Sequence, residues 1–371
     1  MAKIAFLLPD LGAGGAERIA ITLAHAFREA GHEVEFVLMQ KKGELLEALP
    51  SDVRVVDLGA QRIRQAIRPL VGYFRESKPD AVQARMWPLT VAAIAARRLA
   101  RSPARLVVSD HISLSHQAGS SAVKRALVRQ TTRLFYPLAD ARVGVSEGVA
   151  QDLSRLSGIP REDFTLIYNP VAAPGVAAQD SAVEHLWGSA KARFLTVGTL
   201  KEQKNHALLI EGFARVAERL DAKLVIVGEG HLRGALERRI KDLELHGRVE
   251  LVGYVPDPSP YYESADVFVL SSDYEGFAIV IVEALHHALG VVSTDCPSGP
   301  AEILCGGRFG RLVPVGDCAA LAQAMADEWQ TKRKSEELRA RAAEFSLESA
   351  ASAYLGLLVG DREGSKAIPE R

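Results

Sequence analysis

The chain of 371 residues has little cysteine and no long apolar run, and each absence excludes a class of protein. Its three cysteines, Cys296, Cys305 and Cys318, are an odd number without a CxxC spacing, so we expect neither a disulfide framework nor a zinc site. The first apolar run ends at Pro9, which is too short for a signal peptide. No stretch approaches the roughly 18 apolar residues that span a bilayer. We therefore expect a cytoplasmic protein that does not cross a membrane.

Acidic residues are scarce in one part of the chain, although the formal net charge of the whole is only −1. Residues 1–170 hold 23 Lys and Arg against 17 Asp and Glu, whereas the remaining residues hold 22 against 29. Within 53–142 the counts are 16 and 5, a surface that would attract anionic lipid, pyrophosphate groups or nucleic acid. A solvated basic face is the alternative. Aromatic residues make up only 6%, too few for base stacking, so we expect no nucleic-acid partner.

Apolar, β-rich runs alternate with amphipathic stretches along both halves of the chain, which is typical of parallel sheets built from βαβ units. The sequence therefore predicts an α/β fold with two Rossmann-like domains. The predicted strands are 3–8, 34–39, 53–58, 104–109 and 141–145 in the first half, and 193–198, 222–228, 249–253, 266–271 and 291–294 in the second.

The stretch 171–190 is rich in small residues, contains Pro and Gly, and has no strand pattern, so it is predicted to be a linker. An N-terminal domain at 1–170 and a C-terminal domain at 191–345 would flank it. Residues 346–360 are predicted to form a closing helix that packs back on the N-terminal domain. The polar residues 361–371 are predicted to be a flexible tail.

The most informative stretch is 267–304, in which a buried strand runs through a loop into a helix. Glu275 lies in the loop, and Glu283 lies eight residues further on, about two turns into a helix that starts near Ala278. Both carboxylates can then lie at the carboxyl ends of the strands, where α/β sheets bind ligands. The amides of Phe277, Ala278 and Ile279 would lie at the helix N-terminus and could bind a diphosphate or sugar hydroxyls.

These residues resemble a known family, because EGFAIVIVE is similar to the E-x7-E motif of family 4 glycosyltransferases and CPSGPAEIL resembles the segment that comes after this motif in the family. The resemblance implies the GT-B fold, in which two Rossmann-like domains face each other across a cleft. It also implies that Glu275 contacts the donor sugar and that Glu283 holds the ribose of the nucleotide.

A second resemblance lies at 194–214, FLTVGTLKEQKNHALLIEGFA, where the family grips the donor phosphates with a basic pair. Lys204 matches the lysine position, and a cation there would offset the charge that grows on the departing diphosphate. The family's arginine position is occupied by Thr199, and Lys201 is the candidate to replace that arginine.

In the first half, LLPDLGAGGAERIA resembles the family's N-terminal GGAER word. Gly14 and Gly15 would let a substrate approach the backbone closely. His111 follows the strand in VVSDHISLS, where the family frequently carries a histidine that faces the donor sugar. A structural role for this histidine is the alternative.

The resemblance implies a retaining enzyme that moves a hexosyl or N-acetylhexosaminyl group from a nucleotide-sugar, with a UDP-sugar favoured. The acceptor would be a lipid-linked glycan of the cell envelope. The segments 62–78 and 122–138 interleave basic and apolar residues, so we expect peripheral binding to the anionic inner face of the cytoplasmic membrane. No Asp-x-Asp triplet is present, so we expect neither a metal requirement nor a cofactor.

Other readings stay open. A GT-B epimerase or phosphorylase would use a similar fold for other chemistry. A dinucleotide-dependent oxidoreductase is suggested by Gly228, Gly230 and Gly234 after a strand, although their GxGxxxG spacing departs from the usual fingerprint. The sequence does not specify the sugar, the base of the donor, the linkage or the oligomeric state.

Overall fold

The computed structural model describes residues 1–12, 14–119, 121–172 and 181–360. The chain divides into two compact units. The first unit is Met1–Pro170 together with the chain from Leu347 onward, and the second unit is Val171–Ser346. The tail predicted at 361–371 lies outside the described residues.

The first unit is built on a seven-stranded parallel sheet, with the strand order β3-β2-β1-β4-β5-β6-β7. Most residues of its central strands are buried, as expected for a sheet that is covered on both faces. The strands are β1 Lys3–Leu8, β2 Glu33–Leu38, β3 Arg54–Asp57, β4 Ala81–Arg85, β5 Arg105–Asp110, β6 Ala141–Gly144 and β7 Thr165–Leu166.

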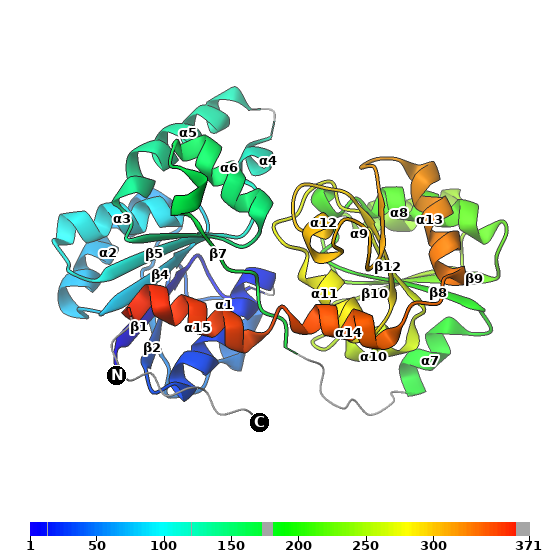
Figure 1. Ribbon diagram of the computed structural model, residues 1–371, viewed down its shortest axis with the longest axis horizontal. Coiled ribbons are helices and arrows are strands. Elements are labelled where there is room, and N and C mark those ends of the chain that lie inside the picture. The colour runs from blue at the N-terminus through cyan, green and yellow to red at the C-terminus, as the bar shows by residue number, and fades with distance from the viewer. Residues whose placement is uncertain (13, 120, 173–180, 361–371) are drawn as a thin grey trace. The chain divides into compact units, whose positions relative to one another are not determined.

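Helices cover both faces of this sheet. In Figure 1, α2 and α3 lie on one face, and α1 lies with the last helix, α15, on the other. The closing helix α15 therefore packs on the first unit, within which it also contacts β4 and β5. The helices are α1 Gly15–Glu29, α2 Ile63–Glu76, α3 Leu89–Ala100, α4 Leu114–Ala118, α5 Ala122–Phe135, α6 Glu147–Ser157 and α15 Leu347–Val359, with the short 3-10 helices η1 Glu44–Ala48, η2 Tyr136–Leu138 and η3 Arg161–Asp163.

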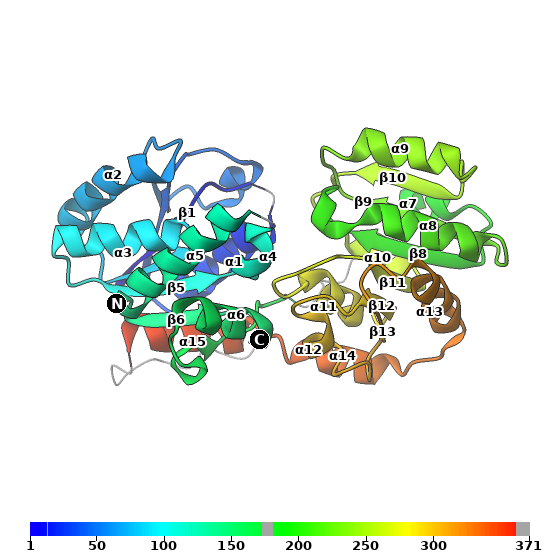
Figure 2. The ribbon, with the colours of Figure 1, turned by 90° about the horizontal axis from the view of Figure 1, so that it is seen from above.

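The second unit repeats this design with a six-stranded parallel sheet, whose strands follow the order β10-β9-β8-β11-β12-β13 down the view of Figure 2. The strands are β8 Ala192–Val197, β9 Ala222–Val227, β10 Val249–Gly253, β11 Val267–Leu270, β12 Gly290–Thr294 and β13 Arg311–Val313. The helices are α7 Ser181–Trp187, η4 Glu202–Lys204, α8 His206–Ala217, α9 Arg233–Asp242, α10 Ser259–Ser264, α11 Ile279–His286, α12 Pro300–Ile303, α13 Cys318–Gln330 and α14 Ser335–Ala343.

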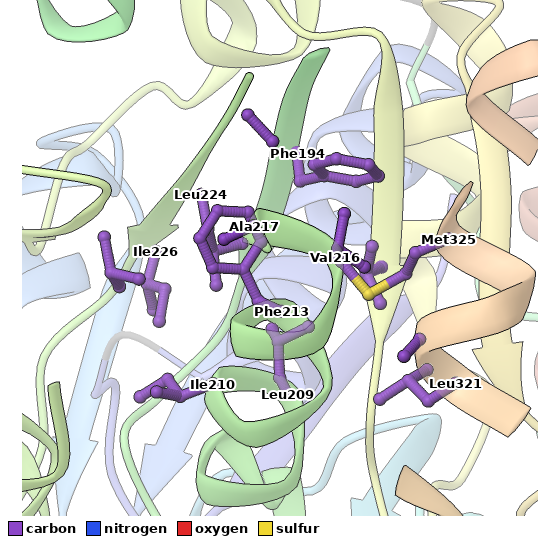
Figure 3. Packing of buried hydrophobic residues seen from close by; sticks show 14 of the residues in the cluster. Phe194, Leu209, Ile210, Phe213, Val216, Ala217, Leu224, Ile226, Leu321 and Met325 are labelled. Carbon is purple, nitrogen blue, oxygen red and sulfur yellow. The ribbon is translucent and has the colours of Figure 1, made fainter. Parts of the chain in front are cut away.

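One core cluster of the second unit lies between its sheet and the helices α8 and α13. Figure 3 shows Phe213 and Val216 of α8 pointing toward Phe194 and Leu224 of the sheet, with Met325 of α13 beside them. These side chains are buried, and removing such surface from water is the main stabilising contribution to a domain of this kind.

The second part of the predicted linker at 171–190 contains a helix, α7, at Ser181–Trp187. Val183 and Trp187 are four residues apart, so they lie on one side of this helix, and both are buried. The indole Nε1 of Trp187 donates a hydrogen bond of 2.9 Å to Oγ of Ser264 in α10. Val183 and Trp187 therefore anchor the end of the predicted linker in the second unit. Residues 173–180 of the linker lie outside the described residues.

Three strands were absent from the sequence prediction: β4, β7 and β13. The omission of β4 is the most consequential, because β4 lies between β1 and β5 near the middle of the sheet. Its sequence, AVQAR, carries Gln83 and Arg85 where an apolar pattern is expected, yet all five residues are buried.

Candidate functional site

Each sheet reverses its strand order at one point, and α/β sheets bind ligands at the carboxyl ends of the strands beside such a reversal. In the second unit the reversal lies between β8 and β11. The loop after β8 contains Thr199, Lys201 and Lys204, and the loop after β11 contains Glu275 and Phe277. The structure thus brings two separate sequence predictions to one edge of one sheet.

Lys204 and Glu275 form an ion pair at this edge. The Nζ of Lys204 lies 2.6 Å from Oε1 of Glu275, and the two side chains are only 14% and 8% exposed. Oγ of Ser272 donates a second hydrogen bond of 2.7 Å to the same carboxylate oxygen. Burial, followed by the Glu275 charge, raises the pKa of the neighbouring Cys296 to about 12, so this cysteine stays a thiol. The site presents one cation and one carboxylate in a largely dry setting, where their charges act strongly.

Hydrogen bonds join the Lys204 loop to the Glu275 loop. The side-chain amide of Gln203 donates to the carbonyl of Tyr274 at 2.8 Å, and the amide of Asp273 donates to the carbonyl of Gln203 at 2.9 Å. The side chain of Asn205 bonds to Asp273 at 2.8 Å. Gln203 and Asn205 flank Lys204 in the sequence. Their hydrogen bonds to the Glu275 loop therefore fix the backbone on both sides of the lysine.

The segment CPSGP, at residues 296–300, also holds the Glu275 loop in place through backbone hydrogen bonds. The amide of Glu275 donates to the carbonyl of Pro297 at 2.7 Å, and the amide of Ser298 donates to the carbonyl of Glu275 at 3.2 Å. Gly299 has a φ of 105°, and a Cβ there would lie 2.4 Å from the carbonyl oxygen of Phe277. The two words that carry the family resemblance are therefore in direct backbone contact, and glycine is required at the closest approach.

Glu283 lies in α11, which begins at Ile279 after Ala278 in the left-handed conformation with a φ of 63°. The amides of Phe277, Ala278 and Ile279 therefore do lie at a helix N-terminus. The hydroxyl of Tyr262 donates a hydrogen bond of 2.7 Å to Oε2 of Glu283. Burial, and then the Glu283 charge, hold the pKa of Tyr262 well above its usual value, so this hydroxyl remains a donor.

Tyr262 and Ser272 were not predicted as site residues. Tyr262 lies in α10 and precedes Glu283 by 21 positions, so no local pattern links the two. Ser272 lies three positions before Glu275, within the stretch 267–304. A hydroxyl side chain so close to the glutamate in the sequence could have been used to predict Ser272 as a site residue.

Thr199 and Lys201 lie in the loop that carries Lys204. The amide of Lys201 donates to the carbonyl of Thr199 at 2.9 Å, and the amide of Lys204 donates to the carbonyl of Lys201 at 3.1 Å. Thr199 is exposed and Lys201 is half-buried. Both lie close to Lys204 along the backbone, and their contact with phosphate stays a prediction.

The glycines that suggested a dinucleotide fingerprint have a packing role. A Cβ at Gly228 would lie 2.0 Å from the carbonyl oxygen of Gly198, and one at Gly230 would lie 2.4 Å from that of Leu200. The loop after β9 is thus pressed against the loop after β8, and only glycine allows this approach. Packing thus accounts for Gly228 and Gly230 without a dinucleotide, whereas a Cβ at Gly234 would meet only the end of the Arg238 side chain at 3.8 Å.

The remaining predicted site residues belong to the first unit. Gly14 is the N-cap of α1, and Gly15 is its first residue; both are exposed. A Cβ at Gly14 would lie 2.2 Å from Oε2 of Glu17, so a side chain there would displace that carboxylate. His111 follows β5, with its Nε2 3.4 Å from Oγ of Ser109. Burial, and then the charge of Arg85, hold the pKa of His111 well below its usual value.

Within the described ranges, no group of three or more His, Cys, Asp or Glu is arranged to hold a metal ion. The same part of the chain contains no helix with the length and apolarity needed to span a bilayer.

Comparison with known proteins covers both units. Residues 13–173 match the family model described as Glycosyltransferase Family 4, and residues 191–330 match the one described as Glycosyl transferases group 1. The N-acetylgalactosamine-N,N'-diacetylbacillosaminyl-diphospho-undecaprenol 4-alpha-N-acetylgalactosaminyltransferase of Campylobacter jejuni is 29% identical over 336 residues, 88% of this chain and 89% of that protein. The lipopolysaccharide core biosynthesis glycosyltransferase LpsE of Rhizobium meliloti is 28% identical over 356 residues, 93% of this chain and 96% of that protein.

Solved glycosyltransferase structures share the fold. Anabaena HepE in complex with UDP-glucose superposes with a TM-score of 0.82 at 21% identity, over 97% of this chain and 100% of that one. The lipopolysaccharide outer core galactosyltransferase WaaB superposes with a TM-score of 0.75 at 21% identity, over 96% of this chain and 99% of that one. These matches confirm the predicted two-domain α/β fold. With a family model matching each unit, the chain belongs to the family 4, group 1 glycosyltransferases and is a glycosyltransferase of the GT-B fold, as the sequence predicted.

Proposed function

We propose that the chain transfers a hexosyl or N-acetylhexosaminyl group from a UDP-sugar to a lipid-linked glycan of the cell envelope, with retention of the anomeric configuration. The observation that carries the proposal is the Lys204 and Glu275 pair at the strand reversal of the second unit. The names of the relatives support the choice of substrates. The Campylobacter relative is named for a diphospho-undecaprenol acceptor, and the HepE structure contains UDP-glucose.

In this proposal the second unit binds the donor. Lys204 and the amides at the start of α11 offset the charge of the leaving diphosphate, Glu275 contacts the sugar, and Glu283 accepts hydrogen bonds from the ribose. The hydroxyl of Tyr262 fixes one oxygen of Glu283, so that the carboxylate is oriented before the nucleotide binds. In the first unit, the family resemblance assigns His111 to the donor sugar, and Gly14 and Gly15 to close contact with a substrate.

The transfer itself needs no protein nucleophile. The acceptor hydroxyl attacks the anomeric carbon on the face from which the diphosphate leaves. The new C–O bond forms as the bond to the phosphate oxygen breaks, and that phosphate oxygen takes the acceptor's proton. The protein positions the reactants and stabilises the developing charge through Lys204. We therefore propose that transfer proceeds without a metal or a cofactor.

Donor identity can be tested by thermal unfolding with UDP-, GDP- and ADP-sugars. A donor at 100 times its Kd should stabilise the fold by about 2.7 kcal/mol, so a UDP-sugar should raise the Tm and the others should not. Glu283→Ala should remove the shift, whereas Glu218→Ala, at an exposed glutamate in the same unit, should retain it. An unchanged shift in Glu283→Ala would refute the ribose assignment, and a GDP- or ADP-sugar response would refute the choice of base.

The acceptor side of the proposal is supported by α5 in the first unit. Val123, Leu127 and Leu134 are 80%, 51% and 68% exposed, and their spacing places them on one side of the helix. Residues 122–138 contain four basic side chains and no acidic one. An exposed apolar stripe within a cationic helix is the pattern of a helix that lies on an anionic membrane surface.

A cavity beside α5 extends this argument. Its volume is about 630 Å³, and its lining includes Arg125, Arg129 and Arg133. Guanidinium groups recognise phosphates well because of their planar, charged donors. The negative charge of a lipid diphosphate at the membrane surface would be complementary to the positive charge of this cavity.

Membrane binding can be tested by pelleting with vesicles of phosphatidylcholine alone and with phosphatidylglycerol added. Binding should be stronger to the anionic vesicles, should weaken with salt, and should be lost in the double variant Leu127→Glu, Leu134→Glu. Leu243→Glu, at an exposed leucine of the second unit, is the matched control. Equal binding to both kinds of vesicle would refute the anionic membrane partner.

The reaction type needs separate tests. The anomeric configuration of the product, read by NMR coupling constants, should match that of the donor. Activity should persist in excess chelator, and a loss that Mg²⁺ restores would contradict the metal-independent transfer. A product without a new glycosidic bond would favour an epimerase or phosphorylase, and tight binding of NADH would favour an oxidoreductase.

A further inference from the structure

The first unit contains a buried polar cluster that the proposed function does not use. Gln83, Arg85 and Ser109 are fully buried, and Tyr354 of α15 is nearly so. Arg85 and Ser109 are register partners on β4 and β5, so their side chains lie on one face of the sheet. Tyr354 joins them on that face, because its ring centroid lies 6.0 Å from the guanidinium carbon of Arg85.

Arg85 is the unusual member of this cluster. One guanidinium nitrogen, Nη1, donates a hydrogen bond of 2.8 Å to the carbonyl of Ala16, but Nε and Nη2 have no hydrogen-bond partner. The structure shows no salt bridge to Arg85 among the residues it describes. The guanidinium lies over the rings of Phe6 at 5.8 Å and Tyr354 at 6.0 Å. A buried charge normally has an ionic partner, since leaving it unpaired is costly.

Arg85 lies at a position in the first sheet where a function can account for its energetically costly burial. Arg85 ends β4, which pairs with β1, and the strand order of the first sheet reverses between these two strands. The loop with Gly14 and Gly15 leaves β1 at the same edge. In the second unit the equivalent reversal carries Lys204 and Glu275. The hydrogen bond from Arg85 to Ala16 therefore holds the first turn of α1 directly behind the glycine loop.

The charge of Arg85 also acts on His111. His111 follows β5, the strand next to β4, and Arg85 is the charged group with the largest effect on its ring after burial itself. The side chain of Asn169 opposes this effect and raises the pKa of His111. The other titratable groups around this cluster and the adjoining loop are Glu17 of α1, Asp110 beside the histidine, His116 of α4, Asp152 of α6 and Tyr354 of α15.

We propose that Arg85 is a positioning residue of the transferase, whose single hydrogen bond fixes the first turn of α1 behind Gly14 and Gly15. The inference rests on the proposed function, because it concerns residues assigned there to substrate binding. A neutral His111 can exchange hydrogen bonds with a sugar hydroxyl as donor or acceptor, whereas an imidazolium only donates. Burial is the main cause that keeps His111 neutral, and the charge of Arg85 lowers its pKa further.

The direct test is an NMR titration of the histidine side chains in the full chain without donor, with the His111 signal assigned through His111→Gln. In Arg85→Met the pKa of His111 should rise, because the substitution removes a positive charge that lowers it. Arg85→Lys, which retains the charge, should leave the pKa near its wild-type value. Tyr354→Phe is a control that removes a buried hydroxyl of the same cluster and no charge. An unchanged pKa in Arg85→Met would exclude an effect of the Arg85 charge on His111.

Two further readouts separate this inference from the proposed function. Amide hydrogen exchange in the peptide covering residues 11–20 should be faster in Arg85→Met than in Tyr354→Phe, and equal rates would overturn the role in the glycine loop. The acidic limb of kcat/KM against pH should move to higher pH in Arg85→Met. If the His111 pKa rises while the pH profile stays in place, the inference stands, and the assignment of His111 to the donor is refuted instead.

Discussion

Replacing Lys204 by methionine should both weaken the second unit and slow sugar transfer. Methionine retains much of the apolar stem and removes the ammonium group that lies 2.6 Å from Glu275. The Glu275 carboxylate would then be buried with one hydrogen bond, from Ser272, and without its cation. The same substitution removes the charge assigned to the leaving diphosphate.

The size of the stability effect follows from the burial of the pair. At 2.6 Å and an effective dielectric constant of about 20, the attraction is about 6 kcal/mol, and desolvation of both groups cancels much of it. Breaking a buried pair by removing one partner costs about 3–5 kcal/mol. Because the side chains are 14% and 8% exposed and Ser272 remains, we expect a cost at or just below the lower end of that range, about 2–3 kcal/mol.

A double-mutant cycle with Glu275→Gln isolates the pair from other effects. Glutamine keeps an acceptor for Ser272 and removes the charge, so Lys204→Met should cost much less in that background. We expect a coupling of about 2 kcal/mol in the free energy of unfolding, measured by urea titration followed through the second unit's tryptophans. With the proposed donor, kcat of Lys204→Met should fall by about 10²–10³.

Two results would refute this reasoning. Additivity of the two substitutions within about 0.5 kcal/mol would show that the ion pair does not contribute to the fold. Full activity in Lys204→Met, at a donor concentration that saturates the variant, would remove Lys204 from the proposed mechanism.

Three further predictions concern the second unit and the closing helix. Tyr262→Phe should weaken UDP binding about fivefold, since one hydrogen bond worth about 1 kcal/mol no longer orients Glu283; an unchanged Kd by calorimetry would contradict this. Burial lowers the pKa of His206 to about 3, below its unfolded value of about 6.5, so the unfolded state takes up the proton first and stability falls as the pH drops below about 6.5. His206→Gln should therefore remove about 2 kcal/mol of the stability difference between pH 7 and pH 5, and equal pH dependences in urea unfolding would exclude this source. Gly299→Ala should cost about 2–3 kcal/mol because its φ is 105° and its Cβ would meet a carbonyl oxygen, whereas Gly356→Ala, with nothing within 4 Å of its Cβ, should be neutral or stabilising by up to about 1 kcal/mol.

Much of the donor site could be predicted from local words in the sequence. Glu275 and Glu283 stand in one stretch of strand, loop and helix, and their spacing alone places one in the loop and the other in α11. Ser146 directly precedes α6, and its side chain accepts a hydrogen bond from the amide of Val149, as an N-cap does. Such features depend on residues within about one or two turns of each other, so the sequence displays them directly.

The partners of these residues could not be predicted in the same way. Lys204 and Glu275 are 71 positions apart, and they meet because β8 and β11 are neighbours in a sheet whose order reverses there. Tyr262 reaches Glu283 from another helix. Strand order is set by how all the helices cover the sheet, and no single segment carries that information.

The first unit shows the same division between the sequence and the tertiary structure. The sequence by itself determined the alternation of strands and helices, the two Rossmann-like domains, the family and the identities of the two glutamates and the lysine. Only the tertiary structure placed AVQAR in the middle of a sheet and buried Arg85 behind the glycine loop. A polar strand looks like a loop in the sequence, because its apolar surroundings come from segments far away along the chain.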